Sequence, residues 1–251
     1  MRAFGHLFWA TSLSCVPAAA QIAEPILTKT AMPAPTGAIS LKLDYAGGIG
    51  QSGGGSQVIP EAILEAGASH GLELLLRFPL LRVTRPGGYA VIGGGQLATG
   101  ARYLVAGGST RAYAVAVQAV VEAPTGNTRI VGNATQAIPE ALVDWRPARQ
   151  VMFHSNIAFD DALGGTGPKV AFVEHSTSVV WLATTHVSPV FEFVGSTNTT
   201  TGRTQLVAQP EAILRQGSHL ELKAGLSLGV NSHTPSVGLR SQVAWFWGRR
   251  E

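Results

Sequence analysis

Three glutamates that recur in one short context are the first candidates for chemistry. Glu61, Glu140 and Glu211 each follow a proline within similar segments. Ten further polar or charged side chains fall on the same side of alternating segments: Glu73, Arg77, Arg102, Gln118, Glu122, Glu192, Glu221, Lys223, Arg240 and Gln242. Such groups can pair across an enclosed space and hold neighbouring strands in register, since buried charges are normally paired. Alternatively, they can line a polar track for a solute or a constriction that selects by charge.

The histidines predict neither a metal site nor a catalytic site. They are dispersed along the chain, and no His-x-His or His-x-x-x-His spacing occurs among them. His154-Ser155 and His175-Ser176 are adjacent pairs, but neighbours on a strand point to opposite faces. There is also no Gly-x-Ser-x-Gly motif. We therefore expect no catalytic residues, no enzyme activity and no cofactor, and keep a hydrolase only as a third alternative.

The first 36 residues predict export. Residues 1–20 contain Arg2, a short apolar run from Leu7 to Val16 and an A-x-A cleavage site that ends at Ala20. That run is too short to span a membrane, so we expect a cleaved signal peptide and a mature chain that starts at Gln21. The single cysteine, Cys15, lies within it. Residues 21–36 are rich in Pro and Ala, and we expect an extended periplasmic lead-in.

Composition limits the classes of protein to which the rest of the chain can belong. The whole chain has 251 residues, 30 of them Gly, a mean hydropathy of +0.20 and only 13% charged residues. No apolar run of roughly 20 residues, the length of a spanning helix, follows residue 20. A closed β-barrel places such a chain in a membrane without a helix. The net charge of +3 comes from scattered basic residues, which gives no reason to expect nucleic-acid binding.

From residue 37 the chain alternates apolar and polar residues in segments of about ten, as the strands of a membrane barrel do. The clearest segment runs from Leu220 to Val230, and the last one ends with Trp245 and Trp247, which suit an aromatic girdle. We count twelve segments: 38–47, 56–66, 69–78, 90–105, 111–123, 130–145, 149–159, 169–182, 186–195, 203–214, 218–230 and 236–247. The prediction is an all-β fold, a closed antiparallel up-and-down transmembrane barrel of about 12 strands over residues 37–251.

An internal similarity supports this count. Residues 56–64, 135–143 and 204–214 each contain a Gln followed by a Pro-Glu-Ala sequence, and the Pro-Glu pairs are 79 and 71 residues apart. Each interval holds four of the predicted strands, so the barrel is expected to consist of similar four-strand units. Because proline lacks the N–H that a ladder needs, the three Pro-Glu pairs predict three equivalent bulges.

The same residues carry a resemblance to a known family. The repeated Pro-Glu strand, Pro124-Thr125-Gly126 and the Gly-rich segment from Gly94 to Tyr103 resemble the outer-membrane family labelled MetA-pathway of phenol degradation. The likeness covers residues 38–247 and implies a channel or uptake role for small hydrophobic or aromatic compounds. The chain departs from the pattern at residues 248–251, which follow the last Trp.

These observations leave several functions open. The first is an outer-membrane channel or transporter-like barrel, whose partners are outer-membrane lipid, the barrel-insertion machinery and a small hydrophobic solute. The second is a structural or interaction barrel with a plugged lumen. A secreted β-sandwich shows the same alternation, but it buries its apolar face in a core and is soluble.

Overall fold

The computed structural model describes residues 24, 26–49, 56–84, 90–127, 134–163, 171–232, 234 and 237–248. The predicted signal peptide, residues 1–20, lies outside these ranges. The described strands form a single antiparallel sheet that closes on itself, because β2 pairs with both β1 and β3. No helix of the described part is long and apolar enough to cross a membrane.

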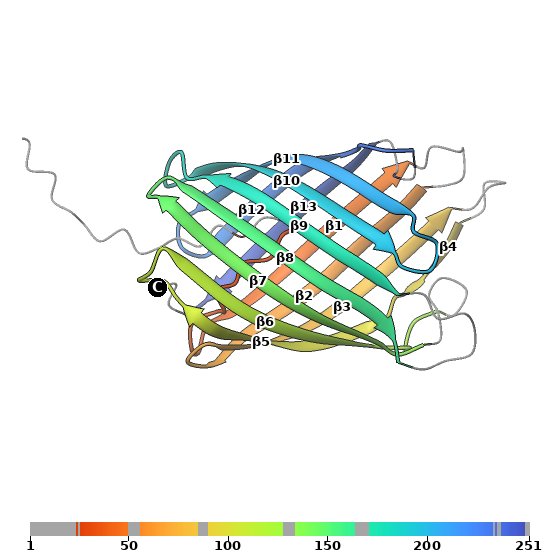
Figure 1. Ribbon diagram of the computed structural model, residues 1–251, viewed down its shortest axis with the longest axis horizontal. Coiled ribbons are helices and arrows are strands. Elements are labelled where there is room, and N and C mark those ends of the chain that lie inside the picture. The colour runs from red at the N-terminus through yellow and green to blue at the C-terminus, as the bar shows by residue number, and fades with distance from the viewer. Residues whose placement is uncertain are drawn as a thin grey trace, which may run out of the picture.

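The described residues form thirteen strand elements of the barrel, and consecutive ones lie side by side except for β4 and β5 (Figure 1). Their bounds are β1 Ile39–Ile49, β2 Ser56–Ser69, β3 Leu72–Thr84, β4 Ala90–Gly94, β5 Leu97–Gly107, β6 Tyr113–Ala123, β7 Gln136–Ala148, β8 Val151–Ala162, β9 Phe172–Trp181, β10 Val187–Asn198, β11 Thr204–Gln216, β12 Leu220–Gly229 and β13 Val237–Trp247.

The short strand β4 shares one position in the barrel with β5. Both pair with β3, β4 along Leu80–Thr84 and β5 along Leu72–Arg77. They are separated at Gly95, whose backbone N–H donates to the carbonyl of Pro79 at 2.8 Å. The chain therefore forms a closed antiparallel barrel with twelve strand positions and one additional short element. The predicted fold class is confirmed, and the single predicted strand at 90–105 is interrupted.

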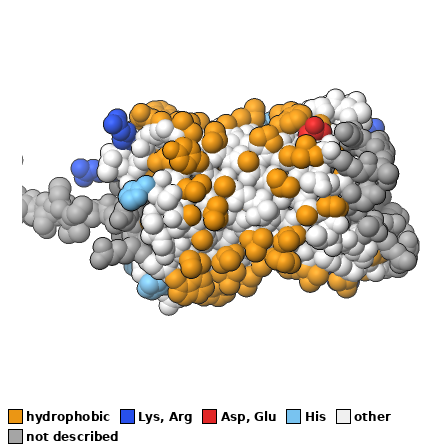
Figure 2. Space-filling view, turned by 90° about the horizontal axis from the view of Figure 1, so that it is seen from below, with side chains coloured by type: hydrophobic (Ala, Val, Ile, Leu, Met, Phe, Trp, Pro, Cys, Tyr) orange, Lys and Arg blue, Asp and Glu red, His pale blue; other side chains and the backbone are white. Residues whose placement is uncertain are grey.

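The outward face of the barrel is apolar. Along β6, for example, Tyr113, Val117 and Val121 are exposed, whereas the alternate residues Ala114, Ala116, Gln118 and Val120 are buried. Figure 2 shows apolar side chains over the middle of the molecule between its two ends. Side chains on neighbouring strands alternate in the same way, so one face contacts lipid and the other encloses the lumen.

An aromatic girdle lies at the end of the barrel where the connections are short. Trp145, Trp181 and Trp247 are each about half exposed there, and the Trp145 ring stacks on Phe153 with centroids 5.4 Å apart. The connections at this end include residues 70–71, 149–150 and 217–219. Outer-membrane barrels turn their short connections to the periplasm, which assigns this end to that side.

The three Pro-Glu pairs do not form the bulges that we predicted. Each proline faces outward and each glutamate inward. The ladder to the following strand lacks the two pairs just before each glutamate, but the register is the same on both sides of the gap. A missing N–H removes a hydrogen bond without requiring an extra residue. The register shifts lie instead near the short connections, at Gly67/Ser69, Leu104/Ala106 and Trp145/Ala148.

The structure describes Glu24 and residues 26–36 of the expected lead-in. Residues 26–36 lie in the lumen, where Thr28 and Ala31 are fully buried. Ala31 packs against Ala114, Ala116 and Leu142, side chains that face the inside of the barrel. We call Glu24 and residues 26–36 the lumen segment. It precedes β1 and occupies the half of the barrel near the short connections.

Candidate functional site

Four carboxylates of the barrel wall hold the lumen segment through its backbone. Together they accept the backbone N–H groups of five residues between Ile26 and Ala34. Such charge-assisted hydrogen bonds are about twice as strong as neutral ones. The contacts are Ile26 N to Glu211 Oε2 at 3.2 Å, Leu27 N and Thr28 N to Glu192 Oε1 at 3.0 and 2.7 Å, Ala31 N to Asp144 Oδ1 at 2.9 Å, and Ala34 N to Glu73 Oε2 at 2.6 Å.

Ion pairs add to this attachment. The Lys29 ammonium lies 2.5 Å from Glu140 Oε2, and Glu24 pairs with Lys42 and lies 3.7 Å from Arg102. Burial raises the pKa of the Glu24 carboxyl, but the charges of Lys42 and Arg102 outweigh burial and hold this pKa well below its usual range. For Lys29, burial lowers the pKa and the Glu140 carboxylate offsets only part of that effect.

A glycine on β2 makes room for the segment. A Cβ atom added at Gly67 would lie 2.0 Å from the carbonyl oxygen of Pro35 and 2.5 Å from that of Ala34. The backbone of Gly67 also exchanges hydrogen bonds with Gly37 and Ala38 at 2.9 Å. A side chain at this position is therefore incompatible with the docked segment unless the backbone of one partner moves.

We expect Gly67→Val to loosen the lumen segment and leave the barrel closed. The measurement is the maleimide labelling rate of a cysteine that replaces Ala31, which is fully buried in the native protein. Cys15 is the one native cysteine, so its removal with the predicted signal peptide leaves the introduced cysteine as the single thiol to be labelled. Labelling should become faster in Gly67→Val. It should not change in Gly94→Val, where an added Cβ meets no atom within 4 Å. Equal labelling of both variants would contradict this account of Gly67.

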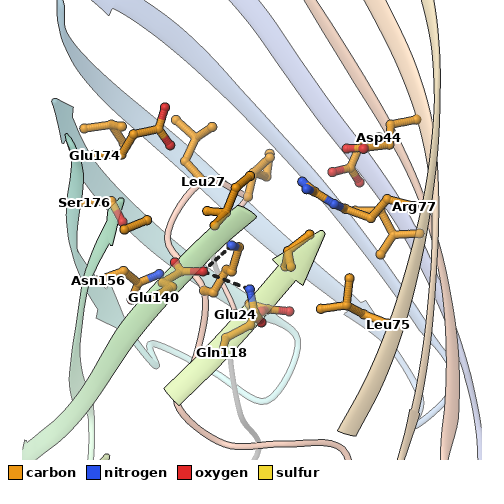
Figure 3. Close-up of a pocket in the computed structure, with 18 of the residues that line it drawn as sticks. Glu24, Leu27, Asp44, Leu75, Arg77, Gln118, Glu140, Asn156, Glu174 and Ser176 are labelled. Atoms are coloured by element: carbon orange, nitrogen blue, oxygen red, sulfur yellow. Dashed lines mark hydrogen bonds and ion pairs between the residues drawn. The ribbon is translucent and has the colours of Figure 1, made fainter. Parts of the chain in front are cut away.

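Beyond the segment, the barrel encloses a cavity of about 550 Å³. Figure 3 shows Glu174 and Ser176 on one wall, Asp44 and Arg77 on the opposite wall, and Leu27 of the lumen segment between them. Eight of the thirteen residues predicted from the sequence line this cavity: Glu61, Arg77, Arg102, Gln118, Glu122, Glu140, Arg240 and Gln242.

The other five predicted residues lie on the inward face but outside the cavity lining. Glu73, Glu192 and Glu211 hold the lumen segment, as described above. Glu221 pairs with Arg215 at 3.2 Å, and its other oxygen lies 4.0 Å from the Lys223 ammonium. These five side chains therefore attach the segment or bridge neighbouring strands.

The inward face carries an excess of acidic groups. Of the 15 Asp and Glu residues in the chain, all but Glu24, Asp161 and Glu251 are strand residues that point inward. They are Asp44, Glu61, Glu65, Glu73, Glu122, Glu140, Asp144, Asp160, Glu174, Glu192, Glu211 and Glu221. The basic residues of the described strands that point inward are Lys42, Arg77, Arg102, Arg146, Arg215, Lys223 and Arg240. The chain as a whole is positive by 3, but its lumen wall is negative.

The sequence interpretation missed several lumen residues. Lys42 and Asp44 occupy alternate positions of the first predicted strand, so the period of two could have identified them. Asn156 on β8 is detectable in the same way, and its amide can accept the Lys29 N–H and donate to the Lys29 carbonyl. Glu24 and Lys29 have no such signal because the lumen segment is aperiodic.

A row of polar residues crosses three neighbouring strands. Asp144, His154 and Ser178 are direct register partners on β7, β8 and β9, and Asp144 Oδ1 lies 2.7 Å from His154 Nδ1. No hydrogen bond joins His154 to Ser178, since His154 Nε2 and Ser178 Oγ are both buried without a partner. The row therefore lacks the contact between nucleophile and base that defines a catalytic triad. Within the described residues, no group of three His, Cys, Asp or Glu side chains could hold a metal ion.

Comparison with known proteins gives structural neighbours only. No family model and no curated protein matches the sequence. The outer-membrane channel of the COG4313 group from Pseudomonas putida F1 is similar in structure, with a TM-score of 0.65 at 13% identity over 90% of this chain and 100% of that chain. The NanC porin has a TM-score of 0.58 at 7% identity, covering 84% of this chain and all of that one. The KdgM porin in complex with oligogalacturonate has a TM-score of 0.57 at 7% identity, over 84% and 99%.

At these identities the neighbours show the fold. They agree with the physical features of the chain itself, a closed sheet with an apolar outer face and an aromatic girdle at one end. A closed barrel is one of the two structures that can satisfy every backbone hydrogen bond in lipid. The protein is an integral β-barrel of the bacterial outer membrane.

Proposed function

We propose that the protein is a narrow outer-membrane channel for small hydrophobic or aromatic compounds. The observation that carries this proposal is the 550 Å³ cavity that a twelve-position barrel keeps open above the lumen segment. The interior of an eight-stranded barrel is filled by side chains, whereas a 16-stranded porin holds an aqueous channel. The interior of a barrel with twelve strand positions is intermediate in width. The cavity is large enough for a small organic molecule.

The cavity wall supports a solute with an apolar part. Leu27 of the lumen segment, Ile63, Leu75, Val120 and Ile138 line the cavity beside the charged groups. The cavity thus offers both apolar and charged side chains, which can contact a solute that has an apolar part and a polar group. The resemblance to the phenol-degradation family, which rests on short motifs, points to the same class of solute.

The test is single-channel recording of the purified protein in a planar lipid bilayer. We expect small, discrete conductance steps, because the lumen segment leaves only part of the cross-section open. Preparation from outer membranes, with a gel shift on boiling, verifies that the folded barrel is present. Folded protein that inserts and stays electrically silent, with or without the lumen segment, would refute the channel function.

One observation favours a second candidate, a structural or interaction barrel with a plugged lumen. The lumen segment is held by four carboxylates and two sets of ion pairs, which favours a segment that stays bound in the lumen. If this attachment is permanent, the barrel serves as a scaffold for its connections. The two candidates differ in the conductance of a barrel from which the segment has been removed.

A further inference from the structure

The distribution of charge in the barrel is not what the composition suggests. Inward strand positions hold twelve acidic and seven basic residues, although the chain has 18 Lys and Arg against 15 Asp and Glu. Of the other described basic residues, Arg111, Arg149 and Arg203 lie in connections, Arg82 lies on the outward face of β3, and Lys29 belongs to the lumen segment. A wall of one sign inside a low-dielectric barrel focuses the field along the lumen and concentrates ions of the opposite sign.

The excess is strongest in the cavity. Asp44 and Glu61 are direct register partners on β1 and β2, where like charges are destabilising unless a cation lies near them. Neither carboxylate forms an ion pair with a described residue. On the other side of the cavity, Asp160 Oδ1 is buried without a hydrogen-bond partner. Of the nearby basic groups, Arg77 is already paired with Glu122 at 2.8 Å and Lys42 with Glu24 and Glu65. Arg240 interacts electrostatically with both Asp44 and Glu61.

The contacts of the lumen segment show which chemical groups the barrel wall binds. The segment offers hydrogen-bond donors to the four carboxylates that hold it, and its one basic side chain, Lys29, lies on Glu140. Its acidic side chain, Glu24, occupies Lys42 and Arg102 of the wall, so these two basic groups are already paired with a carboxylate. Glu211 is 6% exposed and still has one oxygen, Oε1, without a partner. Arg77 Nε and Arg215 Nη2 also lack a hydrogen-bond partner, but both guanidinium groups are already paired with carboxylates. The carboxylate oxygens without a partner therefore suit an ammonium group rather than an anion.

We propose that the channel is cation-selective and that its solutes are small organic cations with an apolar body. The inference rests on the proposed channel function and narrows it. The carboxylates around Asp44, Glu61 and Asp160 attract and bind the positive group, as rings of Asp and Glu do in cation channels. The apolar residues between them, Leu75 and Val120 among others, contact the body of the solute.

The first measurement is the reversal potential in a KCl gradient across the bilayer, for the whole protein and for a variant without residues 24–36. We expect both to prefer potassium over chloride, with a permeability ratio on the order of tenfold. A reversal potential of zero or of the opposite sign, in a barrel that conducts, overturns the inference and leaves the channel function standing. A silent barrel in both forms overturns the channel function and the inference with it.

Two permanently charged aromatic ions then test the solute class. Benzyltrimethylammonium replaces potassium and benzenesulfonate replaces chloride, so that neither ion can cross the lipid in a neutral form. We expect current carried by the cation and little by the anion. Equal or greater current carried by benzenesulfonate would contradict the assignment of organic cations.

A pair of charge-neutralising variants links the selectivity to the cavity. Asp44→Asn with Glu61→Gln keeps the size and hydrogen bonding of both side chains, and we expect the potassium-to-chloride ratio to fall several-fold. The control is Asp161→Asn, which removes one negative charge from the outward face of β8 next to Asp160. An equal fall in both variants, or none in either, would show that the cavity carboxylates do not set the selectivity.

Discussion

Removal of residues 24–36 from the exported chain should raise the single-channel conductance several-fold. The segment fills the lumen between β7, β10 and β3, where it is bound to Asp144, Glu192 and Glu73. The strand ladder from β1 to β13 does not include the segment, so the barrel can close without it. Removal also frees carboxylates that line the wall, and their hydration widens the aqueous path.

The increase is expected to be reversible by a synthetic peptide with the sequence of residues 24–36. Because wall carboxylates bind backbone N–H groups, a peptide of different sequence retains part of the affinity, and the Lys29–Glu140 pair provides the rest. A peptide with Lys29→Ala should therefore block at higher concentration than the native one. If conductance does not change when the segment is absent, the segment is not what restricts the lumen.

The strands could be predicted from the sequence because lipid and lumen impose opposite requirements on alternate residues. Leu220–Gly229 and Val237–Trp247 lie within one or two residues of the expected segments at 218–230 and 236–247. The same period identified thirteen inward polar residues that the structure places on the inward face. The interruption between β4 and β5 was not predicted, since Gly94–Gly95–Gln96 continues the alternation without a charged residue or Pro.

The position of the lumen segment could not be predicted because it depends on contacts that carry no sequence pattern. Ile26, Leu27 and Thr28 are held by their N–H groups, which every residue except proline possesses. The residues that receive them are far away in the chain, 164 residues in the case of Thr28 and Glu192. The one local signal is Gly67, a small residue at an inward position of β2, and its role is visible only beside Pro35.

Substitution of Arg102 by methionine should destabilise the barrel more than any surface change. Arg102 is 2% exposed, lies 3.5 Å from Glu73 and 3.7 Å from Glu24, and donates to Gln118 at 3.1 Å. Methionine retains much of the volume but removes the charge, and two buried carboxylates lose a basic partner. Removal of one partner from a buried ion pair costs about 3–5 kcal/mol. The free energy of unfolding in urea, followed by the gel shift of the folded barrel, measures this loss.

Two further variants separate lost charge pairing from lost packing. Adding Glu73→Gln to Arg102→Met removes the unpaired carboxylate and should restore part of the free energy of unfolding, because the amide is cheaper to bury than the charge. Arg82→Met, on the exposed side of β3, should change it by less than about 0.5 kcal/mol. If Glu73→Gln brings no recovery, the cost of losing Arg102 lies in packing. The carboxylates of the lumen wall would then be stable without this basic partner, because water in the adjoining cavity can hydrate them.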